Sequence, residues 1–337
     1  MNENDNGIVI SSRVRLARNF EDFVFPSRLD DAGSAKVLEK VENALKNSDE
    51  KFGTIKLSDM SDLQAETLKE LHMISDDMLR GNKNGAVVVN KTNDICIMVN
   101  EEDHLREQCI LRGNKLSHAY KKISAIDDMI ASSEKIAFDK RLGYLTACPT
   151  NVGTGLRASA LMFLPGLGMT NSLEKCVNAA SRFDMAVRGE YGEGSNSSGY
   201  LYQISNQKTL GVSEEEIISS VASAVEQIEQ SEILARKALV ESNEVMLRDG
   251  IMRAYGILTS AYRLPFKEFE EKYALVKLGI YYGYISCNDF NAFESLLDKY
   301  RPANMMTHAK KIMNDSERDI YRAANAAAEL KQLTAKV

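Results

Sequence analysis

The spacing of hydrophobic residues changes near residue 240, and this change limits the possible folds more than any other feature of the sequence. Before residue 240, segments with the two-residue period of strands alternate with segments of helical period, whereas almost only helical patterns follow it. A chain of 337 residues also exceeds what one hydrophobic core usually fills. We therefore expect an α+β domain over residues 1–240 and an all-helical domain over residues 241–337.

The first segment with strand character covers residues 7–19, where Val14 and Leu16 alternate with Arg13 and Arg15. Because successive side chains of a strand point to opposite faces, these two arginines should project from the same face. Further strands are expected at 86–90 and 95–100, which form a hairpin, at 143–147, from 186 and at 200–205.

Two helix starts carry a capping box, Ser61 with Gln64 and Ser213 with Glu216. The second of these helices has a continuous apolar side, formed by Ile217, Ile218, Val221, Val225 and Ile228. Other helices are expected at 33–47, from about 102 to a break near 113, at 115–132 and from about 156. We find no internal repeat and no flexible linker between these elements.

The charge balance argues against a general nucleic-acid-binding protein, because 48 Asp and Glu oppose 42 Lys and Arg and the net charge is −6. The five cysteines are odd in number and show no CxxC spacing, so neither a disulfide framework nor a zinc site is indicated. The polar N-terminus and the lack of any run of about 18 apolar residues predict a protein that is neither secreted nor membrane-spanning. A cytoplasmic location fits best.

The familiar P-loop and dinucleotide-binding motifs are absent from the sequence, but several arginines stand beside loops or turns. They are Arg13, Arg15, Arg106, Arg157 and Arg188. Arginine stays charged and offers two parallel donors to phosphate oxygens, so converging arginines could bind a triphosphate without a P-loop. Taken singly, each arginine is more often a surface charge or the partner of a carboxylate.

Four segments together resemble the phosphagen (guanidino) kinases: SSRVRLARNF, NEEDHLR, CPTNVGTGLRAS and RGEYGEGSNSSGYLYQISN. The resemblance covers residues 8–240 in the order and spacing of that family, whose members move the γ-phosphoryl of MgATP onto a guanidinium nitrogen. It implies an antiparallel sheet flanked by helices, similar to that of glutamine synthetase. It also implies ATP and Mg²⁺ as cofactors, with the metal held mainly by phosphates and water rather than by a protein cage.

Two departures from the small-molecule kinases narrow this resemblance. The first strand begins at residue 7, without the preceding helical domain that closes over free creatine or arginine, and RDIYRA occurs at residues 318–323 of the helical region. This pattern is similar to that of bacterial family members that phosphorylate arginine side chains within proteins. The alternatives are a kinase for a small guanidino metabolite and a catalytically silent binding adaptor.

The resemblance to these bacterial family members implies further partners for this chain. They are protein substrates with exposed arginines, a small zinc-binding activator protein, an ATP-dependent protease machinery that degrades the marked proteins, and further copies of the chain in a dimer or larger homo-oligomer. Neither a membrane nor a nucleic acid is among the expected partners. The role implied is protein quality control under stress.

A guanidinium with a pKa above about 12 is a poor nucleophile while it holds its proton, so a pair of carboxylates must orient it and one must accept the proton. The resemblance implies that Glu102 and Glu193 form this pair and that Cys148 is a reactive thiolate which tunes the rate without being required. By themselves, Glu102 could be a helix-start acid, Glu193 a solvated loop residue and Cys148 a small residue before Pro149.

The nucleotide-binding residues implied by the resemblance are Ser11, Ser12, Arg13, Val14, Arg15, His72, Arg106, Arg157, Ala158, Ser159, Ala160, Leu161, Arg188, Gly189, Glu190, Tyr191, Gly192 and Glu193. His72 would lie against the base. A helix starting after Thr154 would add backbone donors to the anion site.

The RDIYRA motif implies an allosteric site for phosphoarginine, formed by Arg318, Asp319, Ile320, Tyr321, Arg322 and Ala323. Arg318 and Arg322 are one helical turn apart, so their guanidinium groups can share one face, with Ala323 leaving room beside them. The plain alternative is a solvated helix face.

Overall fold

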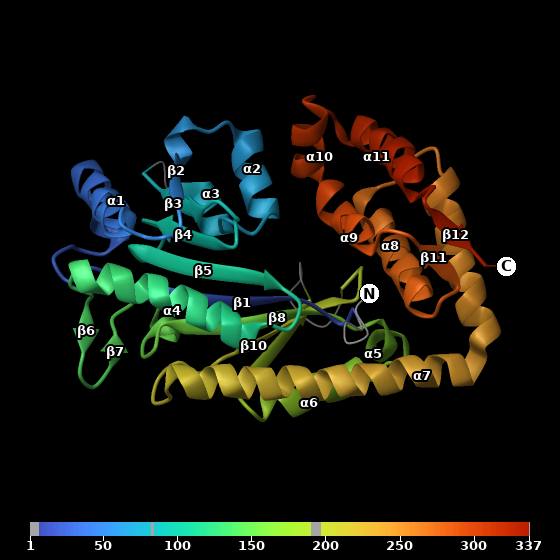
Figure 1. Cartoon of the computed structure of the whole chain (residues 1–337), viewed down its shortest axis with the longest axis horizontal. Helices are drawn as coiled ribbons and strands as arrows, with labels where there is room; N and C mark the ends of the chain where they lie inside the picture. The colour runs from blue at the N-terminus through green and yellow to red at the C-terminus, as the bar shows by residue number, and fades with distance from the viewer. Residues whose placement is uncertain (1–6, 82–83, 190–196, 337) are drawn as a thin grey trace.

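The computed structural model describes residues 7–81, 84–189 and 197–336. Within these residues an eight-stranded antiparallel sheet forms the centre of the molecule, in the order β2-β3-β4-β5-β1-β8-β10-β9 (Figure 1). Its strands are β1 (Val9–Arg18), β2 (Phe52–Lys56), β3 (Ala86–Asn90), β4 (Ile95–Val99), β5 (Leu105–Arg112), β8 (Leu156–Phe163), β9 (Met185–Gly189) and β10 (Leu201–Asn206). The α+β class with an antiparallel sheet is confirmed.

One face of the sheet packs against α4 (Leu116–Ser133) and α7 (Glu214–Ser260), which run beneath it in Figure 1. Val14 and Leu16 of β1 are fully buried in this main core. The predicted apolar side of α7, from Ile217 to Ile228, packs into the same core. Helices α1 (Asp31–Leu45), α5 (Pro165–Met169) and α6 (Leu173–Ser181) complete this part of the molecule.

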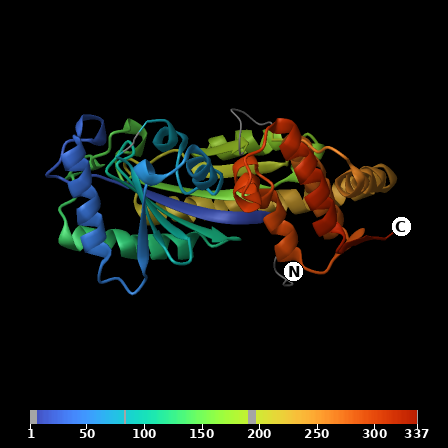
Figure 2. The ribbon, with the colours of Figure 1, turned by 90° about the horizontal axis from the view of Figure 1, so that it is seen from above.

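The other face of the sheet carries two separate helical groups. A small apolar cluster around Leu68, Met73 and Met98 holds α2 (Asp62–Glu70) and α3 (Asp76–Gly81) against β3 and β4. The second group has its own core and consists of α8 (Phe266–Tyr281), α9 (Phe290–Lys299), α10 (Pro302–Ala309) and α11 (Asp315–Leu330). Figure 2 shows the elongated outline that results, with α1 in blue at one end and the orange and red helices in the opposite half.

Helix α7 connects the two cores, and its backbone leaves helical geometry at Asn243, where φ is −164° and ψ is 78°. Its start is fixed by the predicted capping box, since the Ser213 hydroxyl accepts from the Glu216 N–H and the Glu216 carboxylate accepts from the Ser213 N–H. The Ser61 and Gln64 box of α2 is present in the same form. The domain boundary at residue 240 stays a prediction.

Two segments expected to be helical are strands, and both lie at the centre of the sheet. The segment from about 102 is a loop followed by β5, and the segment from about 156 is β8. β5 pairs with β1 and β4, and β8 pairs with β1 and β10. A short apolar run without caps fits a central strand as well as a helix, so long-range pairing decides its structure.

The remaining elements are short. They are β6 (Phe138–Asp139), β7 (Gly143–Tyr144), β11 (Ile285–Cys287), β12 (Leu333–Ala335) and the 3-10 turns Pro26–Arg28, Leu57–Asp59 and Pro149–Asn151. The strand expected at 143–147 is thus only the two residues of β7. In the described part of the chain, none of the helices has the length and apolar character needed to cross a membrane.

Candidate active site

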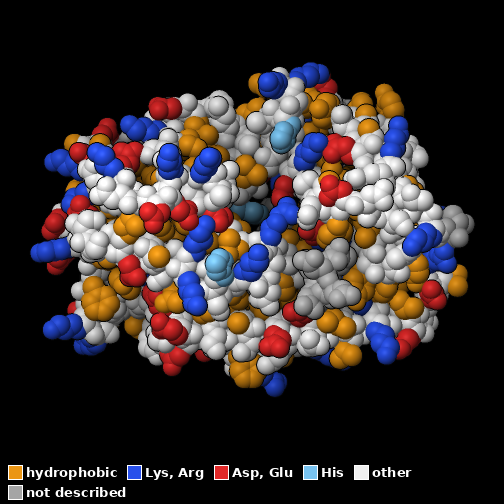
Figure 3. Space-filling view, in the orientation of Figure 1, with side chains coloured by type: hydrophobic (Ala, Val, Ile, Leu, Met, Phe, Trp, Pro, Cys, Tyr) orange, Lys and Arg blue, Asp and Glu red, His pale blue; other side chains and the backbone are white. Residues whose placement is uncertain are grey.

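A cavity of about 960 Å³ lies between the upper face of the sheet and the C-terminal helices. Figure 3 shows this face hollowed near its centre, with blue Lys and Arg side chains beside the opening. The side chains that the sheet contributes are Ser11, Arg13 and Arg15 from β1, Met98 from β4, Arg106, Gln108 and Ile110 from β5, Ser159 and Leu161 from β8, and Gln203 from β10. The period-two pattern of β1 therefore turns Arg13 and Arg15 into the cavity, as predicted.

The cavity floor is strongly cationic. Burial, followed by the nearby charges of Arg13, Arg106 and Arg157, lowers the pKa of Arg15 well below its ordinary value. Among the described residues, the buried Nε of Arg15 has no hydrogen-bond partner. A buried donor in a field of repelling cations is stabilised by an anion, so this arrangement is chemically suited to bind phosphate groups.

Three contacts hold the cavity side chains in place. Arg13 donates to Gln203 Oε1 at 2.8 Å, and Arg106 donates from one nitrogen to both carboxylate oxygens of Glu101 at 2.8 Å. Gln108 donates to the backbone oxygen of His72 at 2.7 Å. His72 adopts a left-handed backbone with φ of 57° directly after α2, and it lines the cavity.

Glu102 lies in the loop between β4 and β5, with an exposed side chain. Partial burial of its carboxyl, and then the neighbouring Asp103 and Glu101, raise the pKa of Glu102, which favours its use as a proton acceptor. The Asn151 side-chain amide donates to Glu102 Oε1 at 3.3 Å. No helix begins here, so the interpretation of Glu102 as a helix-start acid is wrong.

Arg157 connects the separate motifs of the sequence. Burial lowers the pKa of Arg157; Cys148 and Glu102 oppose this effect, and Arg188 and Arg106 add to it. All four groups therefore lie close enough to act on the Arg157 guanidinium. Arg157 also donates to Asn206 O at 3.3 Å. Arginines of β5, β8 and β9 thus lie near Glu102, in the loop before β5, and Cys148, in the loop before β8.

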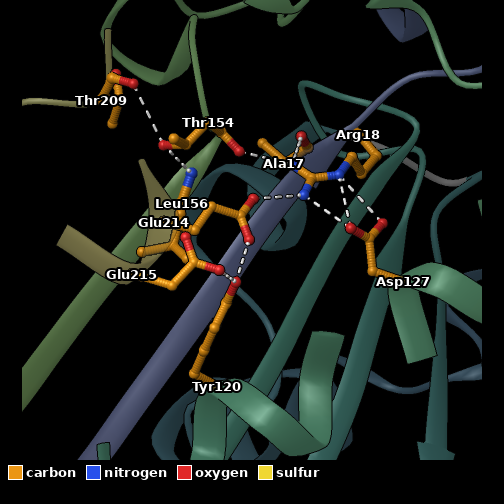
Figure 4. Close-up of polar contacts among 9 residues, drawn as sticks. All are labelled: Ala17, Arg18, Tyr120, Asp127, Thr154, Leu156, Thr209, Glu214 and Glu215. Carbon is orange, nitrogen blue, oxygen red and sulfur yellow. Dashed lines mark hydrogen bonds and ion pairs between the residues drawn. The ribbon is translucent and has the colours of Figure 1, made fainter. Parts of the chain in front are cut away.

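Cys148 is partly exposed in the loop that leads to β8, and its Sγ lies 3.0 Å from Thr150 Oγ1. Arg18 holds this loop from the core side of the sheet, because its side chain donates to Thr154 O at 2.9 Å (Figure 4). Arg18 in turn binds Asp127 of α4 and lies 3.2 Å from Glu214 of α7. Sequence reasoning missed Arg18, although its position two residues after Leu16 places it on the core face of β1.

Several predicted nucleotide residues point away from the cavity. Val14, Ala158 and Ala160 are fully buried in the main core, and the Ser12 hydroxyl donates to Gly113 O at 2.8 Å. The helix expected after Thr154 is wrong, because β8 begins there and offers no helix N-terminus. Glu190, Tyr191, Gly192 and Glu193 lie outside the described residues; Arg188 is exposed and Gly189 is buried at the end of β9.

The RDIYRA motif lies in α11, but its two arginines do not share an open face. Arg322 is 1% exposed and donates to Tyr300 O at 3.0 Å and to Leu264 O at 2.8 Å. Ala323 packs in the C-terminal core beside it, and Tyr321 packs against that core. Ile320 is exposed, whereas Arg318 and Tyr321 are partly exposed, and Arg318 donates to Met313 O and to the Asp315 carboxylate. The predicted shared face is therefore wrong: the amphipathic helix turns Arg322 inward.

Over residues 7–81, 84–189 and 197–336, the chain contains no group of three or more His, Cys, Asp or Glu side chains arranged to hold a metal ion.

Comparison with known proteins identifies two family regions. Residues 36–235 match the ATP:guanido phosphotransferase C-terminal catalytic domain, and residues 244–337 match the protein-arginine kinase McsB C-terminal domain. The chain is 40% identical over 330 residues to the protein-arginine kinase of Caldanaerobacter subterraneus subsp. tengcongensis, covering 97% of this chain and 98% of that protein. It is 42% identical over 330 residues to the protein-arginine kinase of Halalkalibacterium halodurans, covering 97% and 93%.

Solved structures show the same relationship at lower identity. The crystal structure of lombricine kinase superposes with a TM-score of 0.59 at 26% identity, covering 68% of this chain and 67% of that one. The duplicated taurocyamine kinase from Schistosoma mansoni, with bound components of a transition-state analogue, superposes with a TM-score of 0.61 at 27% identity. That match covers 78% of this chain and 38% of the taurocyamine kinase.

Proposed function

The chain belongs to the protein-arginine kinases of the ATP:guanido phosphotransferase family, and on this premise we propose that it transfers the γ-phosphoryl of MgATP to guanidinium nitrogens of arginine side chains in proteins. The observation that carries this proposal is the cluster of Arg15, Arg106 and Arg157 beside the exposed Glu102. The arginines are suited to a triphosphate, and the carboxylate is suited to a cationic acceptor.

Phosphoryl transfer depends on in-line positioning and on compensation of charge on the transferred group. In our proposal the guanidinium groups of Arg13, Arg15, Arg106, Arg157 and Arg188 hold the phosphates. The burial of Arg15 and Arg157 and the repulsion from the neighbouring arginines supply a charge-compensating environment that water would weaken. Mg²⁺ would be held mainly by the phosphates and water and would neutralise charge between the β- and γ-phosphates.

The acceptor arginine must be oriented and must lose a proton. We assign this task to Glu102 with Glu193, and we assign to Cys148 an effect on rate through the local charge around the acceptor. A raised pKa of Glu102 supports its role as base, since a carboxylate with a higher pKa accepts a proton more readily. The exposure of Glu102 supports an acceptor that is carried on another protein.

The proposal is tested by incubation with γ-labelled ATP and either free arginine or an unfolded arginine-rich protein. We expect acid-labile phosphate on arginine residues of the protein. Label on free arginine alone would instead support the metabolite kinase, and no label with either acceptor would support a binding adaptor. Glu102→Gln should lower kcat by roughly 100-fold or more, as for loss of a general base, while Glu134→Gln at the end of α4, on the other side of the sheet, should not.

We further propose the wider context that the family implies. The phosphoarginine mark would direct proteins to an ATP-dependent protease, a small zinc-binding protein would activate the kinase, and the enzyme would act in the cytoplasm as a homo-oligomer. We also propose catalysis within residues 1–240 and regulation within 241–337. Arg318, which reaches the surface of α11, would be the main contact for a regulatory phosphoarginine.

A further inference from the structure

The cavity assigned to ATP is not formed by the sheet region alone. Five residues of the C-terminal helical region line it as well: Phe266, Lys267 and Glu270 at the start of α8, and Arg301 and Pro302 at the start of α10. The beginnings of α8 and α10 therefore form one wall of the cavity, opposite Arg13 and Arg15. We call these five residues the helical wall.

Arg322 holds both parts of the helical wall from behind. Its guanidinium donates to Leu264 O, two residues before Phe266, and to Tyr300 O, directly before Arg301. Its Cζ also lies 5.5 Å from the centre of the Phe266 ring. Because one rigid, planar group spans two chain segments, the separation of the two helix starts depends on this side chain.

The helical wall is also joined to the sheet region on both sides. The Glu70 carboxylate of α2 accepts from the N–H groups of Ala303 and Asn304 at 2.9 and 2.7 Å, which caps α10. On the other side, a Cβ added to Gly199 would lie 2.8 Å from Glu270 Cγ, so the backbone before β10 packs closely against α8. These contacts hold the helical wall in place relative to the sheet region and thereby set the width of the cavity.

Lys267 is the exposed cation of this wall and lies in the first turn of α8. Lys267 lines the same cavity as Arg13, Arg15 and Arg106, so a triphosphate between them would be contacted from both sides. Lysine carries a compact charge on a flexible stem, which allows it to bind a phosphate as a point charge.

We propose that the helical wall is part of the nucleotide site, with Lys267 in contact with bound MgATP and Arg322 as a positioning residue that sets the place of the wall. This inference rests on the proposed function, because it takes the cavity to be the ATP site. It predicts that ATP affinity depends on residues in both regions of the chain. It also gives Arg322 a role in nucleotide binding rather than direct contact with a regulatory ligand.

The experiment compares steady-state kinetics of full-length variants, with MgATP and the protein substrate varied in turn. We expect Lys267→Ala and Arg322→Lys each to raise the KM for MgATP roughly threefold to tenfold, with kcat at saturating ATP and the KM for the protein substrate within about twofold of the parent. The matched controls, Lys272→Ala on α8 and Arg253→Lys on the exposed side of α7, should leave the KM for MgATP unchanged. If Arg322 served only to stabilise the fold, its replacement would not raise the KM for MgATP while leaving the KM for the protein substrate unchanged.

A reference variant, Arg106→Ala, distinguishes the two possible failures. If it leaves the KM for MgATP unchanged, the cavity is not the ATP site and the proposed function fails there. If it raises this KM while Lys267→Ala and Arg322→Lys do not, the helical wall has no part in nucleotide binding and this inference is overturned. Should Arg322→Lys not fold, Asp319→Asn replaces it, because Asp319 Oδ1 accepts from Arg322 at 3.1 Å and its loss loosens the same group.

Discussion

The buried ion pair between Arg18 and Asp127 allows a quantitative test of how the loop at residues 148–155 is held. Asp127 accepts from Arg18 Nε at 3.1 and 3.0 Å and from Arg18 Nη2 at 2.7 Å. The Arg18 side chain is 1% exposed and that of Asp127 is 9% exposed. Asp127→Asn keeps the shape of the side chain but leaves a buried guanidinium without its main counter-charge.

Removing one partner of a buried ion pair costs about 3–5 kcal/mol, because the remaining charge stays desolvated. Glu214 Oε1 remains 3.2 Å from Arg18 and compensates part of this charge, so we expect the lower value, about 3 kcal/mol. For a domain of this size, such a loss lowers the melting temperature by roughly 6–12 °C. The loosened Arg18 also loses its fixed hold on Thr154 O, so kinase activity should fall together with stability.

The free energy of unfolding is measured by urea titration followed by circular dichroism, since the chain contains no tryptophan. Asp128→Asn is the matched control, with the same change of charge one residue further along α4 on an exposed side chain. A loss below about 1 kcal/mol for Asp127→Asn, or a loss equal to that of the control, would refute the reasoning.

Other expectations follow from single side chains. Burial, and then Asp127, raise the pKa of Glu107 well above its usual range, and neither carboxylate oxygen has a hydrogen-bond partner among the described residues. The folded state therefore holds a proton that the unfolded state releases, so the parent should lose stability as the pH rises from about 4.3. Glu107→Gln should flatten this part of the curve in urea titrations at pH 5 and pH 8, and an unchanged slope would contradict the assignment. Cys148→Ser should keep measurable kinase activity but lose sensitivity to peroxide; complete loss of activity would make the thiol essential.

The antiparallel sheet was predictable only in part from local patterns. The strand β1 is evident from the alternation of Val14 and Leu16 with Arg13 and Arg15, because one face contacts the core and the other the cavity. By contrast, β5 and β8 lie between two neighbouring strands, and their composition is equally compatible with a helix. What makes them strands is pairing with β1, across about one hundred residues of sequence for β5 and about 140–150 for β8, which no local window contains.

The residues of the candidate site were also predictable only in part. Residues in motifs at strand ends, such as Arg106 and Arg157, were found because their charge and position were visible along the chain. The helical wall was not found, because Lys267 and Arg301 carry no motif and reach the cavity only through the packing of α10 against α2. The spacing of Arg318 and Arg322 predicts an open shared face that the structure does not have, since spacing along a helix does not show what a face contacts.

The burial of Arg322 changes how the two regions of the chain are connected. Asp319 accepts from Arg263 through Oδ2 at 3.0 Å and from Arg322 through Oδ1 at 3.1 Å. Arg263 is 57% exposed at the surface, whereas Arg322 holds the carbonyls beneath the helical wall. A charge that binds at the surface near Arg263 therefore acts on a carboxylate shared with the group that positions this wall. Asp319 thus connects the exposed Arg263, through hydrogen bonds, to the side chain that holds the two carbonyls beneath the helical wall.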